Sequence, residues 1–138
     1  MRCLDCGGID SVRRVISMSA SLVLSAAVIA PHACLAEDAA ERGAFVFDGN
    51  CADCHKTTAD GKGKGPTLFG IVGRTAGQVA DFDYSDANKN SKLVFDRVTL
   101  DNYVASPNEL IPGTKMRFPG LPIVQDRKDL IEFLATLK

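Results

Sequence analysis

The chain has 138 residues, of which 46% are hydrophobic and 24% are charged, and its formal net charge is −1. This length suits one small domain, and the composition is typical of a globular protein, which excludes a disordered or largely membrane-embedded chain. A charge so close to zero gives no basis for nucleic-acid binding.

Residues 1–36 have the pattern of a secretory signal peptide. Basic residues (Arg2, Arg13 and Arg14) precede the uncharged run 15–30, and small residues follow up to Ala36. A basic start, an apolar middle and small residues before the junction are typical of export signals. We therefore expect export to the periplasm, with cleavage after Ala36.

Cleavage would leave one mature domain over residues 37–138. Its formal charge would be −2, and it would keep two cysteines, one histidine and one methionine. The alternatives are an uncleaved membrane anchor and a lipoprotein attached at Cys34.

A first helix is expected over residues 40–48, directly before the segment Cys51-Ala-Asp-Cys54-His55. This C-x-x-C-H pattern is the attachment signature of c-type haem. Two thiols three positions apart on one helical turn can each form a thioether to the same porphyrin, and the histidine that follows can ligate the iron. The alternative is a disulfide redox motif, which would need a βαβ pattern that the sequence lacks.

The middle of the chain is rich in loops. The run Gly61-Lys-Gly-Lys-Gly65 lacks the spacing of a phosphate-binding loop and is expected to be a solvated loop. A helix is expected over residues 100–105, with Thr99 as its N-cap and Ser106-Pro107 at its end.

Met116 lies in the proline- and glycine-containing segment Ile111-Pro-Gly-Thr-Lys-Met116. A haem that only transfers electrons needs a second axial ligand, and Met116 is the only methionine of the mature domain. The alternative is a core methionine that fills a packing gap.

A last helix is expected after Asp126, its predicted cap. Leu130, Ile131, Leu134 and Leu137 repeat with helical spacing there. No segment alternates as a strand would, so the sequence predicts an all-α fold.

Several further segments accompany the C-x-x-C-H motif. They are Gly65-Pro66, LFGIVGRTAG at 68–77, YSDANKN at 84–90, and IPGTKM at 111–116 with Phe118. In this order they resemble class I cytochrome c, in particular the mitochondrial type and its bacterial cytochrome c2 relatives. The similarity extends from Arg42 to Leu137.

The resemblance implies helices and loops wrapped around one haem c, bound covalently through Cys51 and Cys54, with His55 and Met116 as axial ligands. The first and last helices would cross at a glycine, with Gly43 and Phe47 against Leu130 and Phe133. The Pro66 carbonyl would accept a hydrogen bond from His55. Tyr103 would lie near the Met116 sulfur, although plain core packing is an alternative for Tyr103. Around a haem propionate the resemblance implies Arg74, Tyr84, Asn88 and Thr114.

Two features depart from the family pattern. The chain has no tryptophan, and Phe95, which has no hydrogen-bond donor, occupies the place of the family's tryptophan donor to a propionate. The chain is also slightly acidic, whereas mitochondrial members are strongly basic. Cations can still gather around the haem edge, and the candidates are Lys62, Lys64, Lys89, Lys115 and Arg117.

The expected function is that of a monomeric electron carrier, not an enzyme, that cycles its iron between Fe(II) and Fe(III). The resemblance implies transient docking between a membrane quinol–cytochrome c oxidoreductase and a terminal oxidase or photosynthetic reaction centre. A dedicated acceptor for one periplasmic dehydrogenase is a second hypothesis. A haem peroxidase or ligand-binding sensor is a third, and it would need an open iron site.

Overall fold

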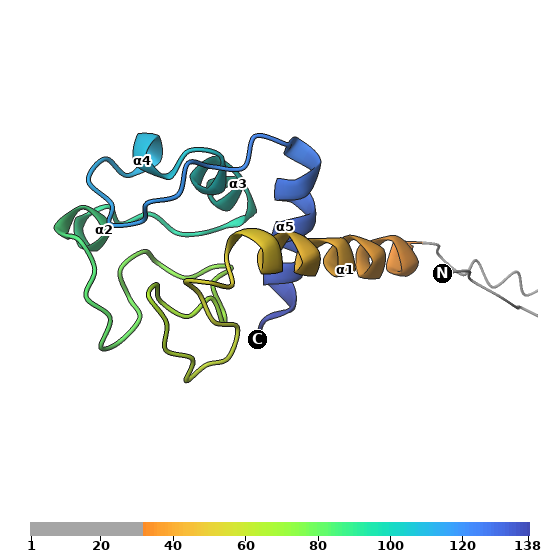
Figure 1. Ribbon diagram of the computed structural model, residues 1–138, viewed down its shortest axis with the longest axis horizontal. Helices are drawn as coiled ribbons and strands as arrows, with labels where there is room; N and C mark the ends of the chain where they lie inside the picture. Colours follow the sequence, from red (N-terminus) through yellow and green to blue (C-terminus); the bar gives the residue numbers. More distant parts are fainter. Residues whose placement is uncertain (1–31) are drawn as a thin grey trace, which may run out of the picture.

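The structure, a computed structural model, describes residues 32–138 (Figure 1). Its helices are α1 (His32–Asn50), α2 (Asp86–Asn90), α3 (Arg97–Ala105), α4 (Pro107–Leu110) and α5 (Val124–Thr136). Within the described residues there is no strand, only an isolated bridge between Thr75 and Val94. The predicted all-α fold is confirmed.

The predicted signal peptide, 1–36, lies almost wholly outside the described residues and stays a prediction. From His32 onward, none of the helices combines the length and apolarity needed to cross a membrane.

Helices α1 and α5 cross one another, and α2, α3 and α4 lie together to one side of this crossing (Figure 1). At the crossing, a Cβ atom on Gly43 would lie 1.9 Å from the carbonyl oxygen of Asp129 and 2.8 Å from Cβ of Phe133. Only glycine allows this approach of the two backbones. The rings of Phe47 and Phe133 pack nearby, with centroids 5.4 Å apart, and Leu130 is fully buried. The predicted crossing at Gly43 is therefore confirmed.

A buried carboxylate joins the same two helices. Arg42 donates from Nε and Nη2 to the two oxygens of Asp129, at 2.7 and 3.0 Å, and Gln125 donates to the same carboxylate at 2.9 Å. Arg42 also pairs with Asp38 one turn earlier on α1. The hydrogen bond from Arg42 holds the pKa of Asp129 below its usual range. These bonds compensate for the removal of the Asp129 charge from water.

The predicted cap of α3 is wrong. Asp96, not Thr99, precedes the first helical turn, and its side chain accepts the Thr99 backbone N–H at 2.7 Å. A capping side chain reaches the second or third backbone N–H inside the helix. Thr99 is the third residue after Asp96, so its backbone N–H is the donor of the capping bond and its side chain is not the cap. The end of the helix at Ala105 is as expected, and Pro107 opens α4, since a first helical position needs no N–H donor.

The predicted cap of α5 is also wrong. The helix begins at Val124 after Ile123, which makes no side-chain capping bond, and Asp126 lies inside the first turn. An acidic residue there still favours the helix through its dipole. The sequence patterns also did not predict α2 and α4, which are too short to show helical periodicity.

Asp129→Asn should lower the free energy of unfolding by about 1–2 kcal/mol at neutral pH, because an amide cannot accept the two charge-assisted bonds from Arg42. The folded state depresses the Asp129 pKa. The ionised Asp129 carboxylate therefore stabilises the folded state above the unfolded-state pKa of about 3.9. This stabilisation is lost as the pH falls through the lower folded-state pKa.

Denaturant unfolding of both proteins from about pH 7 to about pH 3 checks this expectation. The difference in the free energy of unfolding between the wild type and Asp129→Asn should be constant above about pH 5 and should shrink below about pH 4. Asp48→Asn, an exposed change on α1, is the matched control and should alter stability by less than about 0.5 kcal/mol. A difference that does not vary with pH would show that the Asp129 charge contributes nothing.

Candidate functional site

The helices and loops enclose a cavity with a volume of about 460 Å³. Most of its wall is apolar, and the aliphatic side chains come from several segments of the chain. This volume is in the range of small-molecule and cofactor sites. The aliphatic and aromatic lining residues include Leu68, Ile71, Phe82, Leu100, Val104, Phe118, Leu130 and Leu134.

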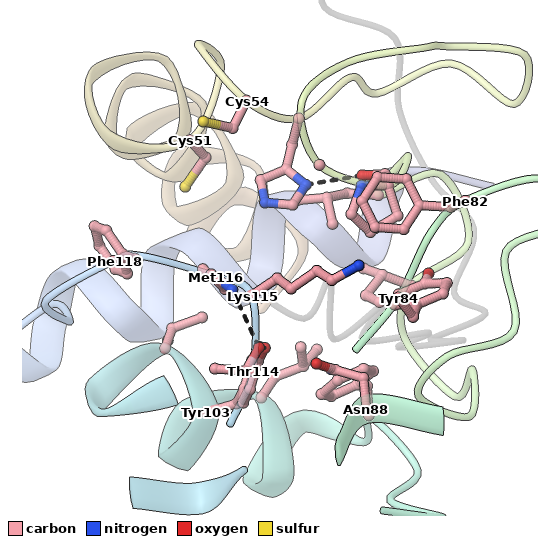
Figure 2. Close-up of a pocket in the computed structure, with 18 of the residues that line it drawn as sticks. Cys51, Cys54, Phe82, Tyr84, Asn88, Tyr103, Thr114, Lys115, Met116 and Phe118 are labelled. Atoms are coloured by element: carbon pink, nitrogen blue, oxygen red, sulfur yellow. Dashed lines mark hydrogen bonds between the residues drawn. The ribbon is translucent and has the colours of Figure 1, made fainter. Parts of the chain in front are cut away.

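The C-x-x-C-H segment forms one wall of this cavity. It continues the winding of α1, because Cys51 N–H donates to the Phe47 carbonyl at 2.8 Å and His55 N–H donates to the Cys51 carbonyl at 2.8 Å. Cys51, Cys54 and His55 therefore lie within a single turn directly after the end of α1, as the spacing predicted. Figure 2 shows both cysteine side chains above the cavity.

The two thiols are free in the structure. Burial raises the pKa of Cys51 to about 11, with a smaller contribution from Cys54. Redox motifs of the thioredoxin kind depend on a lowered thiol pKa, so the environment of Cys51 is the opposite of what the disulfide alternative needs.

The loop that follows the motif folds back and orients the His55 ring. Nδ1 of His55 lies 2.8 Å from the Pro66 carbonyl oxygen, which is the hydrogen bond that the resemblance implied. Burial, the largest influence, lowers the pKa of His55 and favours the neutral imidazole. A neutral ring with Nδ1–H bound to a carbonyl leaves Nε2 free to bind a metal.

Gly65 is needed for this arrangement. A Cβ atom on Gly65 would lie 2.4 Å from Cε1 of His55. Gly63 similarly leaves room for the Cys54 carbonyl, 2.3 Å from its ideal Cβ position. The loop was expected to be merely solvated. Its lysines are exposed, but Gly63 and Gly65 pack closely against the C-x-x-C-H segment. The glycine at every second position of the run was the sequence signal for such close packing.

Met116 also lines the cavity, on the segment that leads from α4 to α5. Its backbone N–H donates to Oγ1 of Thr114 at 3.2 Å, and this oxygen lies 3.3 Å from the Tyr103 hydroxyl (Figure 2). The fold thus brings Met116, Thr114 and Tyr103 together in the same cavity wall, although Tyr103 also packs in the core.

The remaining predicted residues, Arg74, Tyr84 and Asn88, line the cavity as well. Arg74 donates to the carbonyls of Thr67 at 2.7 Å and Phe69 at 2.9 Å, and burial lowers its pKa. Burial raises the pKa of Tyr84. The side-chain oxygen of Asn88 accepts a hydrogen bond from the Ser85 hydroxyl at 2.9 Å. These groups give one region of a mostly apolar cavity a polar character.

Phe95 is buried in the wall, and its ring centroid is 5.1 Å from that of Tyr103. Its backbone is fixed on both sides, since Phe95 N–H donates to the Arg74 carbonyl and its own carbonyl accepts from Gly73. The side chain offers the cavity no hydrogen-bond donor.

Charges at the cavity are mixed in sign. Of the five cations expected around it, Lys64, Lys115 and Arg117 are lining residues, whereas Lys62 and Lys89 are not. Asp53 lines the cavity too. Lys115 is paired with Asp83, and its hydrogen bond lowers the pKa of that carboxyl.

Comparison with known proteins matches residues 40–138 to the sequence model of one family, described as Cytochrome c. The chain belongs to the cytochrome c family. It has the class I fold, and members of the family carry a covalent haem c and transfer electrons.

Individual cytochromes c from distant organisms are similar to this chain. Cytochrome c 2.1 of Caenorhabditis briggsae is 46% identical over 94 residues, which cover 68% of this chain and 84% of the relative. Cytochrome c2 of Rhodoblastus acidophilus is 48% identical over 89 residues, or 64% of this chain and 83% of the relative. The structure of cytochrome cH from Methylobacterium extorquens matches with a TM-score of 0.66 and 39% identity, over 70% of this chain and 97% of the other.

The residues present fit a haem c. The cavity combines an apolar wall, two free thiols just after the end of a helix, and the His55 imidazole, whose Nδ1 is already hydrogen-bonded to Pro66. A porphyrin needs an apolar surround, and covalent attachment needs thiols that are not joined to each other.

Gly65→Ala should destabilise the haem-loaded protein by about 1–3 kcal/mol, because the new methyl group displaces the His55 ring and weakens its bond to Pro66. Denaturant unfolding measures the loss. Gly49→Ala is the matched control, since an added Cβ there meets nothing within 4 Å. In helix α1 that change should be neutral or stabilising by up to about 1 kcal/mol. Equal stability of the two variants would rule out the close packing of Gly65 on His55.

Proposed function

We propose that this member of the family is a single-haem electron carrier whose haem c is attached to Cys51 and Cys54, with His55 and Met116 as axial ligands. The observation that carries the proposal is one cavity lined by the C-x-x-C-H segment, by Met116 and by aliphatic side chains. When bound, the haem supplies a one-electron Fe(II)/Fe(III) couple.

The role of the protein around His55 is to hold the ring in one orientation. The Pro66 carbonyl fixes the Nδ1–H tautomer, and Gly65 leaves the space that the ring occupies. A ring that is already oriented and neutral loses little freedom on binding a metal, and its hydrogen bond strengthens electron donation from the other nitrogen.

The role of the segment around Met116 would be to hold a thioether in the wall of the cavity that the His55 imidazole also lines. Thr114 accepts the Met116 N–H, and Tyr103 lies within hydrogen-bonding distance of the same hydroxyl. Thioether ligation raises the reduction potential of a haem relative to ligation by two histidines. A peroxidase or sensor would need an open position, and Met116 in the cavity wall favours the carrier instead.

Arg74, Tyr84, Asn88 and Thr114 are proposed to receive the carboxylates of the haem. The guanidinium of Arg74 is partly buried and bound only to backbone carbonyls, so an anion beside it is electrostatically favourable. Buried carboxylates need such partners, because leaving water without them is costly.

We further propose that the chain is exported by cleavage after Ala36 and works as a monomer in the periplasm. Its partners would be a membrane quinol–cytochrome c oxidoreductase as donor and a terminal oxidase or photosynthetic reaction centre as acceptor, or one periplasmic dehydrogenase. The names of the related cytochromes c2 and cH support a bacterial carrier of this kind. Lys64 and Arg117 at the cavity would steer an acidic partner, so electron-transfer rates should fall with added salt.

The attachment is tested on protein exported from cells able to mature c-type cytochromes. Intact mass should exceed that of chain 37–138 by one haem, and acid–acetone should fail to extract the pigment. A protein without added porphyrin mass would overturn the proposal. Rapid one-electron reduction and reoxidation, without peroxidase turnover, would separate the carrier from the enzyme alternative.

Met116→Ala should keep the covalent haem but lose the absorption band of methionine-ligated ferric iron. Its reduction potential should fall by on the order of 0.1 V, because water or an added ligand replaces a thioether that favours Fe(II). Potentiometric titration followed by absorption measures both effects. A variant with an unchanged spectrum and potential would exclude Met116 as a ligand.

Phe95→Trp should alter the reduction potential and its pH dependence, because an indole N–H adds a hydrogen-bond donor to a wall where phenylalanine has none. Redox titrations across a range of pH values measure the change. Phe95→Tyr tests whether any donor at this position suffices. If Phe95→Trp gives the same reduction potential and pH dependence as the wild type, the lack of a donor at position 95 has no influence on the haem carboxylate.

A further inference from the structure

The segment 115–120, which contains Met116, has few polar ties to the rest of the protein. Before it, Ile111 is buried and its N–H donates to the Pro107 carbonyl at 2.9 Å. After it, Leu121 N–H donates to the Val104 carbonyl at 2.8 Å. Between these anchors, Met116 N–H bonds only locally to Thr114. Apolar packing of Met116 and Phe118 against the core supplies the remaining contact.

One side chain of this segment makes polar contacts with another part of the protein. Nζ of Lys115 lies 2.5 Å from Oδ2 of Asp83 and 3.0 Å from the Asp83 backbone carbonyl. Across the described residues 32–138, no other hydrogen bond or ion pair links segment 115–120 to the other elements. Figure 2 shows Lys115 extending from beside Met116 toward Tyr84, the residue after Asp83.

The partner of Lys115 belongs to a well-anchored part of the chain. Next to Asp83, the rings of Phe82 and Tyr84 pack edge to face, with centroids 4.7 Å apart. Ser85 is buried and caps α2 through a bond from the Asn88 N–H at 3.1 Å. Asp83 is therefore presented from an ordered turn, and Lys115 spans from the loosely tied segment to this fixed point.

We propose that the Asp83–Lys115 ion pair is a positioning pair that holds the Met116 segment closed over the cavity and so limits how readily Met116 gives way to another ligand. The proposal rests on Met116 being the sixth ligand. An outside ligand can bind the iron only when Met116 moves away, so its apparent affinity is proportional to the open fraction. An exposed ion pair changes such an equilibrium by a small factor, and salt weakens it.

The test is a titration of the ferric, haem-loaded protein with imidazole, followed by absorption. Asp83→Asn should raise the apparent imidazole affinity about two- to fivefold at low salt. Wild-type affinity should increase with salt toward that of the variant, whereas the variant should respond little. Amide hydrogen exchange of residues 115–118 should quicken in the variant without a change in α5.

Glu132→Gln is the matched control. It removes one negative charge from another partly exposed ion pair, that with Arg97, and Glu132 does not line the cavity. Its imidazole affinity should equal that of the wild type. The double variant Asp83→Lys with Lys115→Asp reverses the pair and should restore affinity toward the wild-type value. If Asp83→Asn matches Glu132→Gln, or if the reversed pair fails to restore affinity, the proposal is overturned.

Met116→Ala separates this proposal from the one it rests on. If Met116 is the ligand, this variant should bind imidazole far more tightly than any ion-pair variant. If Met116→Ala and the wild type bind imidazole equally, the axial assignment is wrong and the positioning role falls with it. If Met116→Ala differs but Asp83→Asn does not, only the positioning role is wrong.

Discussion

The close approach of α1 and α5 at Gly43 is the constraint on which the rest of the structure depends. The C-x-x-C-H segment follows directly on α1 and is hydrogen-bonded to its last turn, so the direction of α1 across α5 decides where both thiols and the imidazole lie. α5 in turn contributes Leu130 and Leu134 to the cavity. A side chain at position 43 would force the helices apart and move the attachment segment relative to the apolar wall.

Charged groups have different roles according to their burial. At the helix crossing, the Asp129 carboxylate is enclosed and receives donors from Arg42 and Gln125, so it favours a single arrangement of the two helices. Next to the cavity wall, the side chains of Asp83 and Lys115 meet in solvent, where an ion pair is weak. The first suits a permanent scaffold. The second adds only a small stabilisation to the segment that carries Met116.

The cavity explains why so much of this domain lacks regular structure. Its wall is assembled from loops, short helices and the faces of α3 and α5, and its aliphatic side chains belong to the core or pack against it while also lining the cavity. Family membership supplies the reason, because a covalently bound haem provides the missing apolar partner. The charges around the cavity are mixed in sign, since Asp53 lines it together with Lys64.

The sequence by itself determined the chemistry: the spacing of Cys51, Cys54 and His55, the single methionine of residues 37–138, and the apolar repeat of the last helix all follow from local pattern. It also predicted the helix crossing, through family resemblance. The sequence pattern misassigned Thr99 as the cap of α3 and Asp126 as the cap of α5. Capping depends on which side chain reaches a free backbone N–H, and this is decided by where the first helical turn begins. Only the tertiary structure revealed the Asp129 network, the packing of Gly65 on His55 and the Asp83–Lys115 pair. Such contacts join residues far apart in the chain, and their existence depends on how the whole fold brings distant segments together.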